Sequence, residues 1–157
     1  MALDNNSFSI FLDTIKRFVD NKLIPREEEV ADTNNIPNDI VEEMKNMGLF
    51  GISIPTEYGG SNLSMEQEVE LTFELGRASP AFRSMAGTNI GIGSQTIVMS
   101  GTDEQKSKYL PKFSTGEIIG SFALTEPDSG SDAMSIKTTA KKNGNKYIIN
   151  GTKRYIT

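Results

Sequence analysis

The sequence of 157 residues predicts an α+β fold, in which an all-α helical bundle is followed by the beginning of an antiparallel β-barrel-like domain. Two observations lead to this prediction. Apolar residues recur at helical spacing through about the first hundred residues, and after Gly116 the pattern changes to short β-like runs separated by Asn-Gly pairs. We therefore expect a helical domain over residues 1–116 and the first strands of an incomplete β domain over residues 117–157.

The first two helices are predicted from their caps and their apolar spacing. Ser7 is the expected N-cap of the first helix, and Pro25 should end or kink it. Pro37 lies near the first turn of the second helix, which should end at Gly48 in a left-handed C-terminal cap. A connector over residues 49–60 follows, and we expect its apolar half to be buried and its Gly-rich end to turn.

Two capping boxes predict two more helices. Ser64 with Gln67 should open a helix that runs to about residue 78, and Thr102 with Gln105 should open a short helix that reaches Leu110 before a proline. The apolar residues of the first of these helices are Met65, Val69 and Phe73, with Leu71 and Leu75 flanking them.

Between these two helices, a helix rich in small residues is expected from about Pro80 to Ser100. Gly87 and Gly91 are four residues apart and therefore lie on one face of it. Each glycine costs about 1 kcal/mol relative to alanine inside a helix. We therefore expect something to approach this face closely, either a neighbouring helix or a ligand.

The last part of the sequence is predicted to form strands. The pairs Asn143-Gly144 and Asn150-Gly151 are signals for tight hairpin turns. The final run stops at Thr157 without a closing turn, so we expect the chain to be cut within a β domain. The expected strands cover residues 118–125, 134–142, 146–149 and 153–157.

Composition excludes several kinds of chemistry. The net charge is −5 and there is no long basic run, so nothing steers the protein toward nucleic acid or an anionic membrane. The sequence has no Cys and no His, which removes disulfides, thiolate nucleophiles, the usual proton shuttle and the commonest metal ligands. We expect no metal site, so any chemistry must come from carboxylates, hydroxyls, backbone groups or a bound cofactor.

No apolar stretch is long enough to span a bilayer, and charged residues interrupt the N-terminus where a signal peptide would be apolar. We expect a cytoplasmic location, although a mitochondrial matrix protein whose transit peptide had been removed would look the same.

The stretch Ser121–Asp132 combines an apolar run with a polar loop. Phe122 and Leu124 suit a buried strand, which Pro127 should end. Hydroxyls and backbone N–H groups then gather at a strand end, where ligands commonly bind. By local chemistry this loop is either a surface turn held by Ser and Asp side chains or a ligand site. Its donors are Thr125, Ser129, Gly130 and Ser131.

Four segments in this order resemble the acyl-CoA dehydrogenase family, and the resemblance extends over the chain from about residue 8. It corresponds to the family's N-terminal helical domain and the start of its middle β domain. The four segments are Pro55–Gly60, Gly101–Pro111, Phe122–Asp132 and Asn150–Thr157.

The resemblance implies a flavoprotein that removes a hydride from the β carbon and a proton from the α carbon of a fatty acyl-CoA thioester. In this family FAD accepts the hydride at N5, the enzyme is usually a homotetramer, and an electron-transferring flavoprotein takes the electrons. The family's catalytic base is a Glu on a C-terminal helical part that is not among these residues. We therefore expect no catalytic residue in this chain, and little or no activity from the chain alone.

Site residues are also implied by the resemblance. Gly87 and Gly91, together with Phe122 and Ser131, would contact the acyl-CoA substrate, and the missing side chains of the two glycines suggest a medium-to-long acyl chain. The implied FAD contacts are Phe122, Leu124 and Thr125 along the ring, Gly130 and Ser131 at the pyrophosphate or thioester, and Tyr155 and Thr157 near N5.

Tyr155 departs from the Trp or Phe that is frequent in the family at its position, and its phenol needs a partner. We expect Glu126 and Asp132 to have structural roles within the loop. The resemblance leaves an acyl-CoA oxidase or an acyl-carrier-protein dehydrogenase of the same superfamily as alternatives, and a non-catalytic helical binding module as a different class of protein.

Overall fold

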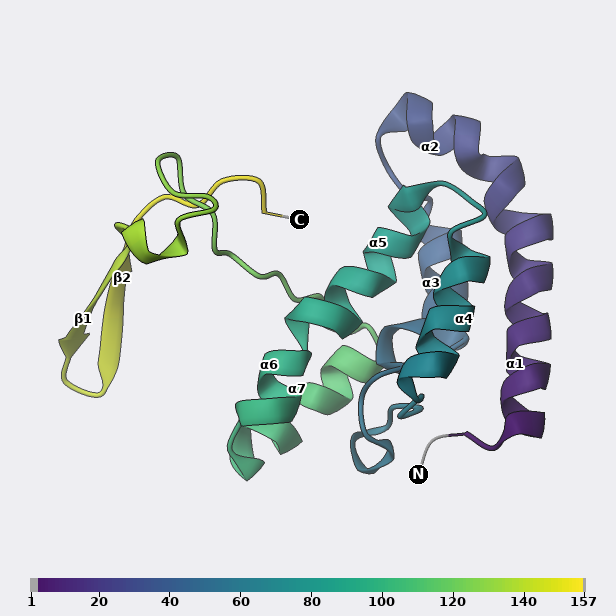
Figure 1. Cartoon of the computed structure of the whole chain (residues 1–157), viewed down its shortest axis with the longest axis horizontal. Coiled ribbons are helices and arrows are strands. Elements are labelled where there is room, and N and C mark those ends of the chain that lie inside the picture. The colour runs from purple at the N-terminus through teal and green to yellow at the C-terminus, as the bar shows by residue number, and fades with distance from the viewer. Residues whose placement is uncertain (1–2, 157) are drawn as a thin grey trace. The chain divides into compact units, whose positions relative to one another are not determined.

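The computed structural model describes residues 3–156, and the chain divides into two compact units, Met1–Gly120 and Ser121–Thr157. The first unit is helical and the second contains an antiparallel hairpin (Figure 1), which agrees with the predicted fold class. The domain boundary expected after residue 116 stays a prediction.

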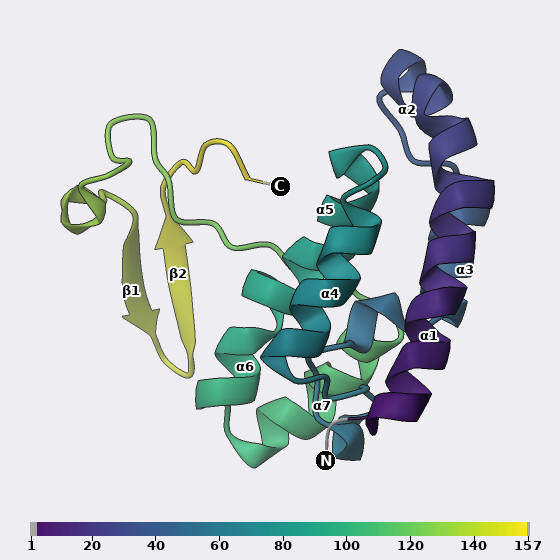
Figure 2. The same ribbon diagram turned by 45° about the vertical axis from the view of Figure 1, so that its right-hand side comes forward.

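The helical unit is a bundle in which α4 packs against both α1 and α5 (Figure 2). Short 3₁₀ and π-helical turns connect or extend its α-helices. Its elements in chain order are α1 (Asn5–Phe18), η1 (Val19–Leu23), η2 (Ile24–Arg26), α2 (Glu27–Thr33), α3 (Asn38–Asn46), η3 (Leu49–Gly51), η4 (Thr56–Tyr58), α4 (Met65–Leu75), α5 (Pro80–Thr88), η5 (Asn89–Gly93), α6 (Gln95–Ser100) and α7 (Asp103–Ser114).

The first helix begins earlier than predicted. Asp4, not Ser7, is the N-cap of α1, because its Oδ1 accepts hydrogen bonds of 3.0 Å from the backbone N–H groups of Asn6 and Ser7. Ser7 lies inside the first turn, and its hydroxyl donates to the other carboxylate oxygen of Asp4. A carboxylate is favoured here because it also faces the positive end of the helix dipole.

The helical path also continues past Pro25, through η1 and η2, into α2. Pro25 lies in the first turn of η2, where the hydrogen-bond pattern changes from the π type to the 3₁₀ type. Helix α2 was not predicted from the sequence, since only Val30 in it is buried and its first turn is entirely acidic.

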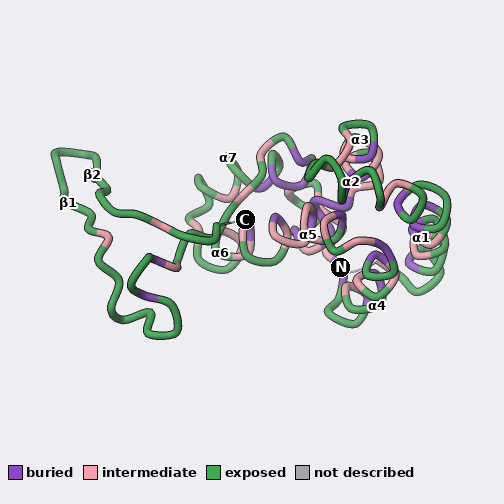
Figure 3. Tube along the Cα trace, turned by 90° about the horizontal axis from the view of Figure 1, so that it is seen from above, coloured by how far each residue is buried: buried purple, intermediate pink, exposed green. Residues whose placement is uncertain are grey.

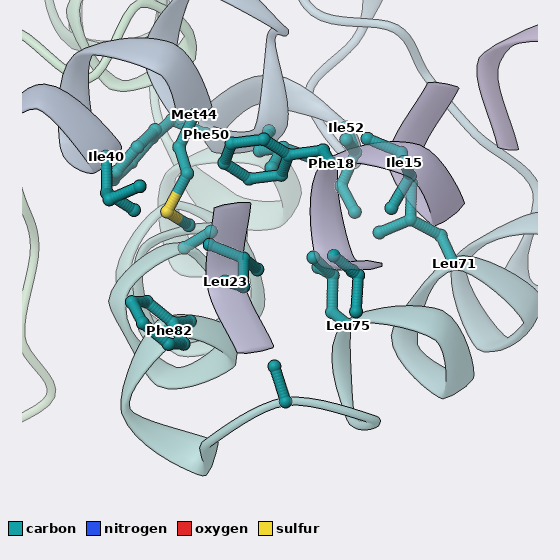
Figure 4. Close-up of a cluster of buried hydrophobic side chains, with 14 of the residues drawn as sticks. Ile15, Phe18, Leu23, Ile40, Met44, Phe50, Ile52, Leu71, Leu75 and Phe82 are labelled. Atoms are coloured by element: carbon teal, nitrogen blue, oxygen red, sulfur yellow. The ribbon is translucent and has the colours of Figure 1, made fainter. Parts of the chain in front are cut away.

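The second predicted helix and the connector are confirmed. Helix α3 follows Pro37, and Gly48 adopts a left-handed φ of 74° just after it. The apolar residues of the connector are fully buried and contribute Phe50 and Ile52 to the core (Figure 4). The other labelled core residues are Ile15, Phe18, Leu23, Ile40, Met44, Leu71, Leu75 and Phe82.

The capping box of α4 is confirmed, but the helix ends at Leu75 and its apolar row faces outward. Met65 and Phe73 are each 75% exposed, whereas Leu71 and Leu75 are buried. Five of the eleven residues of α4 are apolar, so periodicity alone could not say which row packs on α1.

The helix expected from Pro80 to Ser100 is divided into α5, the π-helical η5 and α6. Asn89, the first residue of η5, is completely buried. Its Nδ2 donates to the carbonyl of Phe113 at 3.1 Å and to that of Phe50 at 3.5 Å, and its Oδ1 accepts from the backbone N–H of Gly120 at 2.9 Å. One amide therefore joins the connector, the end of α7 and the last residue of the unit.

The capping box of α7 is confirmed, but the helix passes through Pro111 and ends at Ser114, not at Leu110. Pro111 lies close to the end of the helix, where its missing N–H removes only one hydrogen bond. Gly116 then reverses the chain with a φ of 70°.

In the second unit, β1 (Thr139–Asn143) pairs with β2 (Lys146–Asn150), and Asn143 stands opposite Lys146. The hairpin is as predicted, but its two turn residues are Gly144 and Asn145, not the Asn143-Gly144 pair. Both strands are exposed along their whole length (Figure 3). A short 3₁₀ turn, η6 (Ala133–Ser135), precedes them.

Two predicted strands, 118–125 and 153–157, form no ladder within the described residues. The backbone donors and acceptors there are used differently: Gly120 bonds to Asn89, and Thr125 accepts one bond from the N–H of Arg154 at 2.8 Å. An extended run becomes a strand only when a second run lies beside it in register, which the sequence of the run does not specify.

Within residues 3–156, no helix has both the length and the apolar character needed to cross a membrane.

Because Asn89 satisfies two buried carbonyls and the partly buried N–H of Gly120, replacing it with the similarly sized Leu should leave them unpaired. We expect Asn89→Leu to destabilise the protein by about 2–4 kcal/mol, measured as a shift of the urea unfolding midpoint. Asn46→Leu, on the exposed side of α3, is the control and should change the stability by less than about 0.5 kcal/mol. Equal effects of the two substitutions would contradict this role for Asn89.

Candidate functional site

The polar loop of the second unit is built around the carboxylate of Glu126, which is nearly buried. Its Oε2 accepts from the N–H of Lys137 at 2.6 Å, and its Oε1 accepts from the N–H of Thr138 at 3.0 Å and from the Thr138 hydroxyl. Lys153 completes the set with an ion pair of 2.9 Å to Oε1. Glu126 therefore has the structural role that we expected from the sequence.

These bonds change the acidity of Glu126. The hydroxyl of Thr138, the N–H of Lys137 and the ammonium of Lys153 lower the pKa of the Glu126 carboxyl to about 2. A carboxylate with so low a pKa is a poor general base at neutral pH.

The loop closes on itself next to Glu126. The backbone of Glu126 and Ser129 exchanges two hydrogen bonds, of 2.9 and 3.2 Å, around the turn that contains Pro127. The Ser129 hydroxyl, also buried, donates to the carbonyl of Asp132 at 2.6 Å. Asp132 in turn accepts from the hydroxyl of Ser135, so its carboxylate is used within the loop, as expected.

The same network brings two distant segments together. Lys153 Nζ donates to the carbonyl of Leu124 at 3.0 Å, and the N–H of Arg154 donates to the carbonyl of Thr125 at 2.8 Å. The segment that ends the apolar run is thus fastened to the segment that carries Tyr155. Just before this segment, Gly151 passes so close to Thr138 that a Cβ there would overlap it.

The residues expected to contact FAD lie on these two segments. Phe122 and Leu124 were expected in a buried strand, but they are 51% and 38% exposed, because no second strand covers this run within the described residues. Thr125 is half-buried, and Gly130 and Ser131 are exposed. A Cβ built on Gly130 would meet no atom within 4 Å, so a ligand could approach the backbone there. Thr157 lies outside the described residues.

Tyr155 has an unusual backbone. Its φ is 57°, in the left-handed region that non-glycine residues rarely adopt, and its side chain is 81% exposed. The guanidinium carbon of Arg154 lies 4.9 Å from the centroid of its ring. The ring is therefore accessible on a segment that Lys153 and Arg154 hold to residues 124–126.

The helical unit contains a separate candidate site, a hollow of about 100 Å³ beside α5. Gly87 and Gly91 both line it, with Thr72, Arg83 and Ile90 among the other residues. A second hollow of about 270 Å³ is lined by Met65, Glu68, Val69, Thr72, Phe73 and Arg83, so three residues of α4 and α5 belong to both.

The two glycines differ in what they leave open. A Cβ on Gly91 would meet no atom within 4 Å, so no neighbouring helix packs closely there. A Cβ on Gly87 would lie 3.4 Å from the guanidinium carbon of Arg83. The backbone at Gly91 therefore borders open space, whereas the guanidinium of Arg83 lies over Gly87, and the slot for an acyl chain stays a prediction.

Arg83 and Glu68 add charge to this hollow, and the sequence analysis had not singled them out. Arg83 makes no ion pair with any described residue. Burial raises the pKa of the Glu68 carboxyl, opposed by the nearby Ser53 hydroxyl. The spacing of Arg83 four residues before Gly87 could have indicated a shared face, but a single surface arginine is common and gives no specific signal.

The two candidate sites have different chemistry. The second unit offers hydroxyls, backbone groups and accessible aromatic and aliphatic side chains, which suit a ring with polar edges and a phosphate tail. The helical unit offers a partly apolar hollow lined by one cation, Arg83, and one carboxyl, Glu68, which suits a small organic chain with a polar end.

Family models match both units. The model of the acyl-CoA dehydrogenase N-terminal domain matches residues 7–117, and that of the acyl-CoA dehydrogenase middle domain matches residues 121–157.

Curated relatives match nearly the whole chain. It is 38% identical over 146 residues to the mitochondrial isovaleryl-CoA dehydrogenase of Pongo abelii. The aligned region covers 92% of this chain and 34% of that protein. It is equally 38% identical to the (2S)-methylsuccinyl-CoA dehydrogenase of Cereibacter sphaeroides, covering 92% of this chain and 26% of the relative. The chain thus spans about a third or less of the length of these relatives.

Solved structures agree. An acyl-CoA dehydrogenase from Bacillus anthracis complexed with FAD is 36% identical with a TM-score of 0.86, covering 98% of this chain and 26% of that one. A glutaryl-CoA dehydrogenase in complex with glutaryl-CoA is 32% identical with a TM-score of 0.87, and the match covers 99% of this chain and 40% of that one. A structure described as an electron transferring flavoprotein of Acidaminococcus fermentans is 33% identical with a TM-score of 0.89, covering 99% and 41%.

The network around Glu126 should be sensitive to acid. The folded pKa of about 2 lies below the ordinary value of about 4.3. The charged carboxylate therefore stabilises the loop fully above about pH 4.3, and this stabilisation is lost as the pH falls toward 2. We expect the amides of Lys137 and Thr138, corrected for intrinsic exchange rates, to lose protection from hydrogen exchange in this window.

Glu126→Gln should remove the pH dependence of that protection, because the amide does not titrate. Asp128→Asn is the control, since Asp128 pairs with Lys137 at the surface. Protection in the unmodified protein that already fails above pH 4.3, or that the Gln variant leaves dependent on pH between 4.3 and 2, would contradict the assignment.

Proposed function

The chain belongs to the acyl-CoA dehydrogenase family, and we propose that the protein it forms part of is an FAD-dependent enzyme that dehydrogenates an acyl-CoA thioester between its α and β carbons. The observation that supports this most directly is that the chain's own contacts hold Leu124 and Thr125 beside the Lys153–Tyr155 segment. Of these residues, the resemblance assigns Leu124, Thr125 and Tyr155 to the flavin.

FAD, when bound, would supply the acceptor for the hydride that leaves the β carbon. The chain's own contribution is to bind and orient. The Thr125 hydroxyl is a donor for the polar edge of the ring, Phe122 and Leu124 are apolar surfaces for its face, and Tyr155 supplies an accessible aromatic ring. Gly130 and Ser131 lie at the loop tip, where the pyrophosphate or the thioester would bind.

The proton of the α carbon needs a base, and no residue of this chain is proposed for it. Glu126 is engaged by four donors and has a pKa of about 2, and Asp132 is hydrogen-bonded within the loop. The resemblance assigns the base to a Glu outside these residues, so we propose that catalysis requires that further part.

The partners that we propose are an electron-transferring flavoprotein as the electron acceptor and a homotetramer as the assembly. The cytoplasm or the mitochondrial matrix is the proposed location. An acyl-CoA oxidase or acyl-carrier-protein dehydrogenase would use the same half of the fold with a different acceptor or carrier, and a binding module would retain the fold without the flavin.

Two acyl classes fit different features of the hollow. The open space at Gly91 supports a medium-to-long fatty acyl chain. The guanidinium of Arg83 beside Gly87 forms no ion pair with a described residue, Glu68 of the same hollow included. It supports a second candidate, a short acyl group that ends in a carboxylate, because a cation that lines a hollow favours an anionic ligand. Two of the similar proteins are named after glutaryl-CoA and methylsuccinyl-CoA, and both of these thioesters carry such a carboxylate.

The proposal is tested by the colour and turnover of the complete protein. We expect a yellow protein with bound FAD that reduces an electron-accepting dye when an acyl-CoA is added. A colourless protein that takes up no added FAD would overturn the flavoenzyme and support a binding module. The 157-residue chain alone should give no turnover with FAD, and turnover would show that the base lies within it.

Gly91→Leu should lower kcat/KM for octanoyl-CoA without loss of thermal stability, since the added side chain points into open space.

The second acyl candidate is tested with two thioesters of equal chain length, glutaryl-CoA and pentanoyl-CoA. If Arg83 binds the terminal carboxylate, Arg83→Met should lower kcat/KM for glutaryl-CoA by about 100-fold, the size expected for loss of a charged hydrogen bond of roughly 3 kcal/mol. The value for pentanoyl-CoA should not fall.

Arg77→Met is the matched control, because Arg77 is paired with Asp20 and Glu74 and lines neither hollow. An unmodified enzyme that prefers pentanoyl-CoA strongly over glutaryl-CoA would exclude the carboxylate candidate while leaving the dehydrogenase proposal intact.

A further inference from the structure

One ion pair of the second unit is protected from solvent, unlike the pair at its surface. The side chain of Glu126 is 4% exposed and that of Lys153 is 24% exposed, and their charged atoms are 2.9 Å apart. The neighbouring pair of Lys137 and Asp128, at 2.8 Å, is 73% and 69% exposed. Solvent screens the second pair, whereas the first pair acts in a medium of lower dielectric constant.

The shielded pair lies between the two segments that we assign to the flavin. Lys153 reaches both the carboxylate of Glu126 and the carbonyl of Leu124, so it bridges the residues on either side of Thr125. The next residue, Arg154, bonds to the carbonyl of Thr125 itself. Lys153 and Arg154 therefore contact all three residues 124–126, and the carbonyl of Thr125 itself accepts one of these bonds.

Removing one partner would leave the other in a shielded place without its counter-charge. A buried ion pair broken in this way is strongly destabilising locally, since the remaining ion keeps its desolvation cost. Glu126 would keep the donors from Lys137 and Thr138, whereas Lys153 would keep, among the described residues, only the carbonyl of Leu124.

We propose that Glu126 and Lys153 are positioning residues that set both the register of Thr125 against Tyr155 and the electrostatic potential at the bound flavin. This inference rests on the proposed function, because it requires that FAD binds along these segments. Reduction adds negative charge to a flavin, so a neighbouring positive charge makes reduction easier and a negative charge makes it harder. In the intact pair the two effects largely cancel.

The electrostatic part separates this proposal from a purely structural role. A pair that only holds the loop together would, when broken from either side, loosen flavin binding in the same way. A pair that also acts on the flavin should shift its midpoint potential in opposite directions, depending on which charge is removed.

The experiment uses the complete FAD-containing protein at pH 7.5 and measures the flavin midpoint potential by spectroelectrochemistry, together with kcat and KM. Glu126→Gln should shift the potential to more positive values and Lys153→Met to more negative values. In both variants kcat should fall by about 10- to 100-fold, with a smaller change in KM, because misplacement of the ring affects the reacting geometry.

Two controls match these variants. Asp128→Asn and Lys137→Met remove the exposed pair of the same unit and should leave the potential unchanged. Lys153→Arg keeps the positive charge and should therefore have the flavin potential of the unmodified protein and most of its kcat. If Glu126→Gln does not fold, the comparison of Lys153→Met with Lys153→Arg tests whether the charge acts on the flavin, since only Lys153→Met should shift the midpoint potential.

A flavoprotein whose potential is the same in Lys153→Met as in the unmodified protein, or shifts in the same direction in both single variants, would overturn this inference and leave the proposed function standing. A complete protein that binds no flavin would overturn both.

Discussion

A carboxylate that is almost removed from water must have its charge compensated by fixed donors, and around Glu126 that requirement organises the second unit. Its partners come from residues 137–138 and from Lys153, so a single side chain connects the loop, the entry to the hairpin and the segment after it. The hairpin itself is exposed on both strands. The order of this unit therefore depends on polar contacts more than on an apolar core.

Asn89 plays a comparable part in the helical unit. A completely buried amide is tolerated only when its donors and acceptors are used, and Asn89 satisfies groups of Phe50, Phe113 and Gly120. It lies where the helix changes to a π-helical turn, a feature that frequently accompanies functional sites. The same turn carries Ile90 and Gly91, which line the hollow, so the residue that joins parts of the bundle directly precedes the candidate acyl site.

Both candidate sites thus join a rigid polar anchor to an accessible surface. In the second unit Glu126 is inaccessible while Thr125, Gly130 and Tyr155 remain available to a ligand. In the helical unit Asn89 is buried while Gly91 and Arg83 border open space. This division explains why the strongly perturbed carboxylate of the chain is a poor candidate for a catalytic base: its pKa of about 2 results from the bonds that hold the structure.

The sequence by itself determined the change from helices to β structure after Gly116, the two capping boxes, the buried connector and the hairpin, because these follow from contacts within a few residues. It also determined the family, since ordered motifs such as residues 122–132 are specific. Only the tertiary structure decided which row of α4 is buried, that α7 continues through Pro111, that Arg83 lies over Gly87, and that Lys153 pairs with Glu126. The physical reason is distance along the chain: Glu126 and Lys153 are 27 residues apart, and no local pattern records a partner that far away.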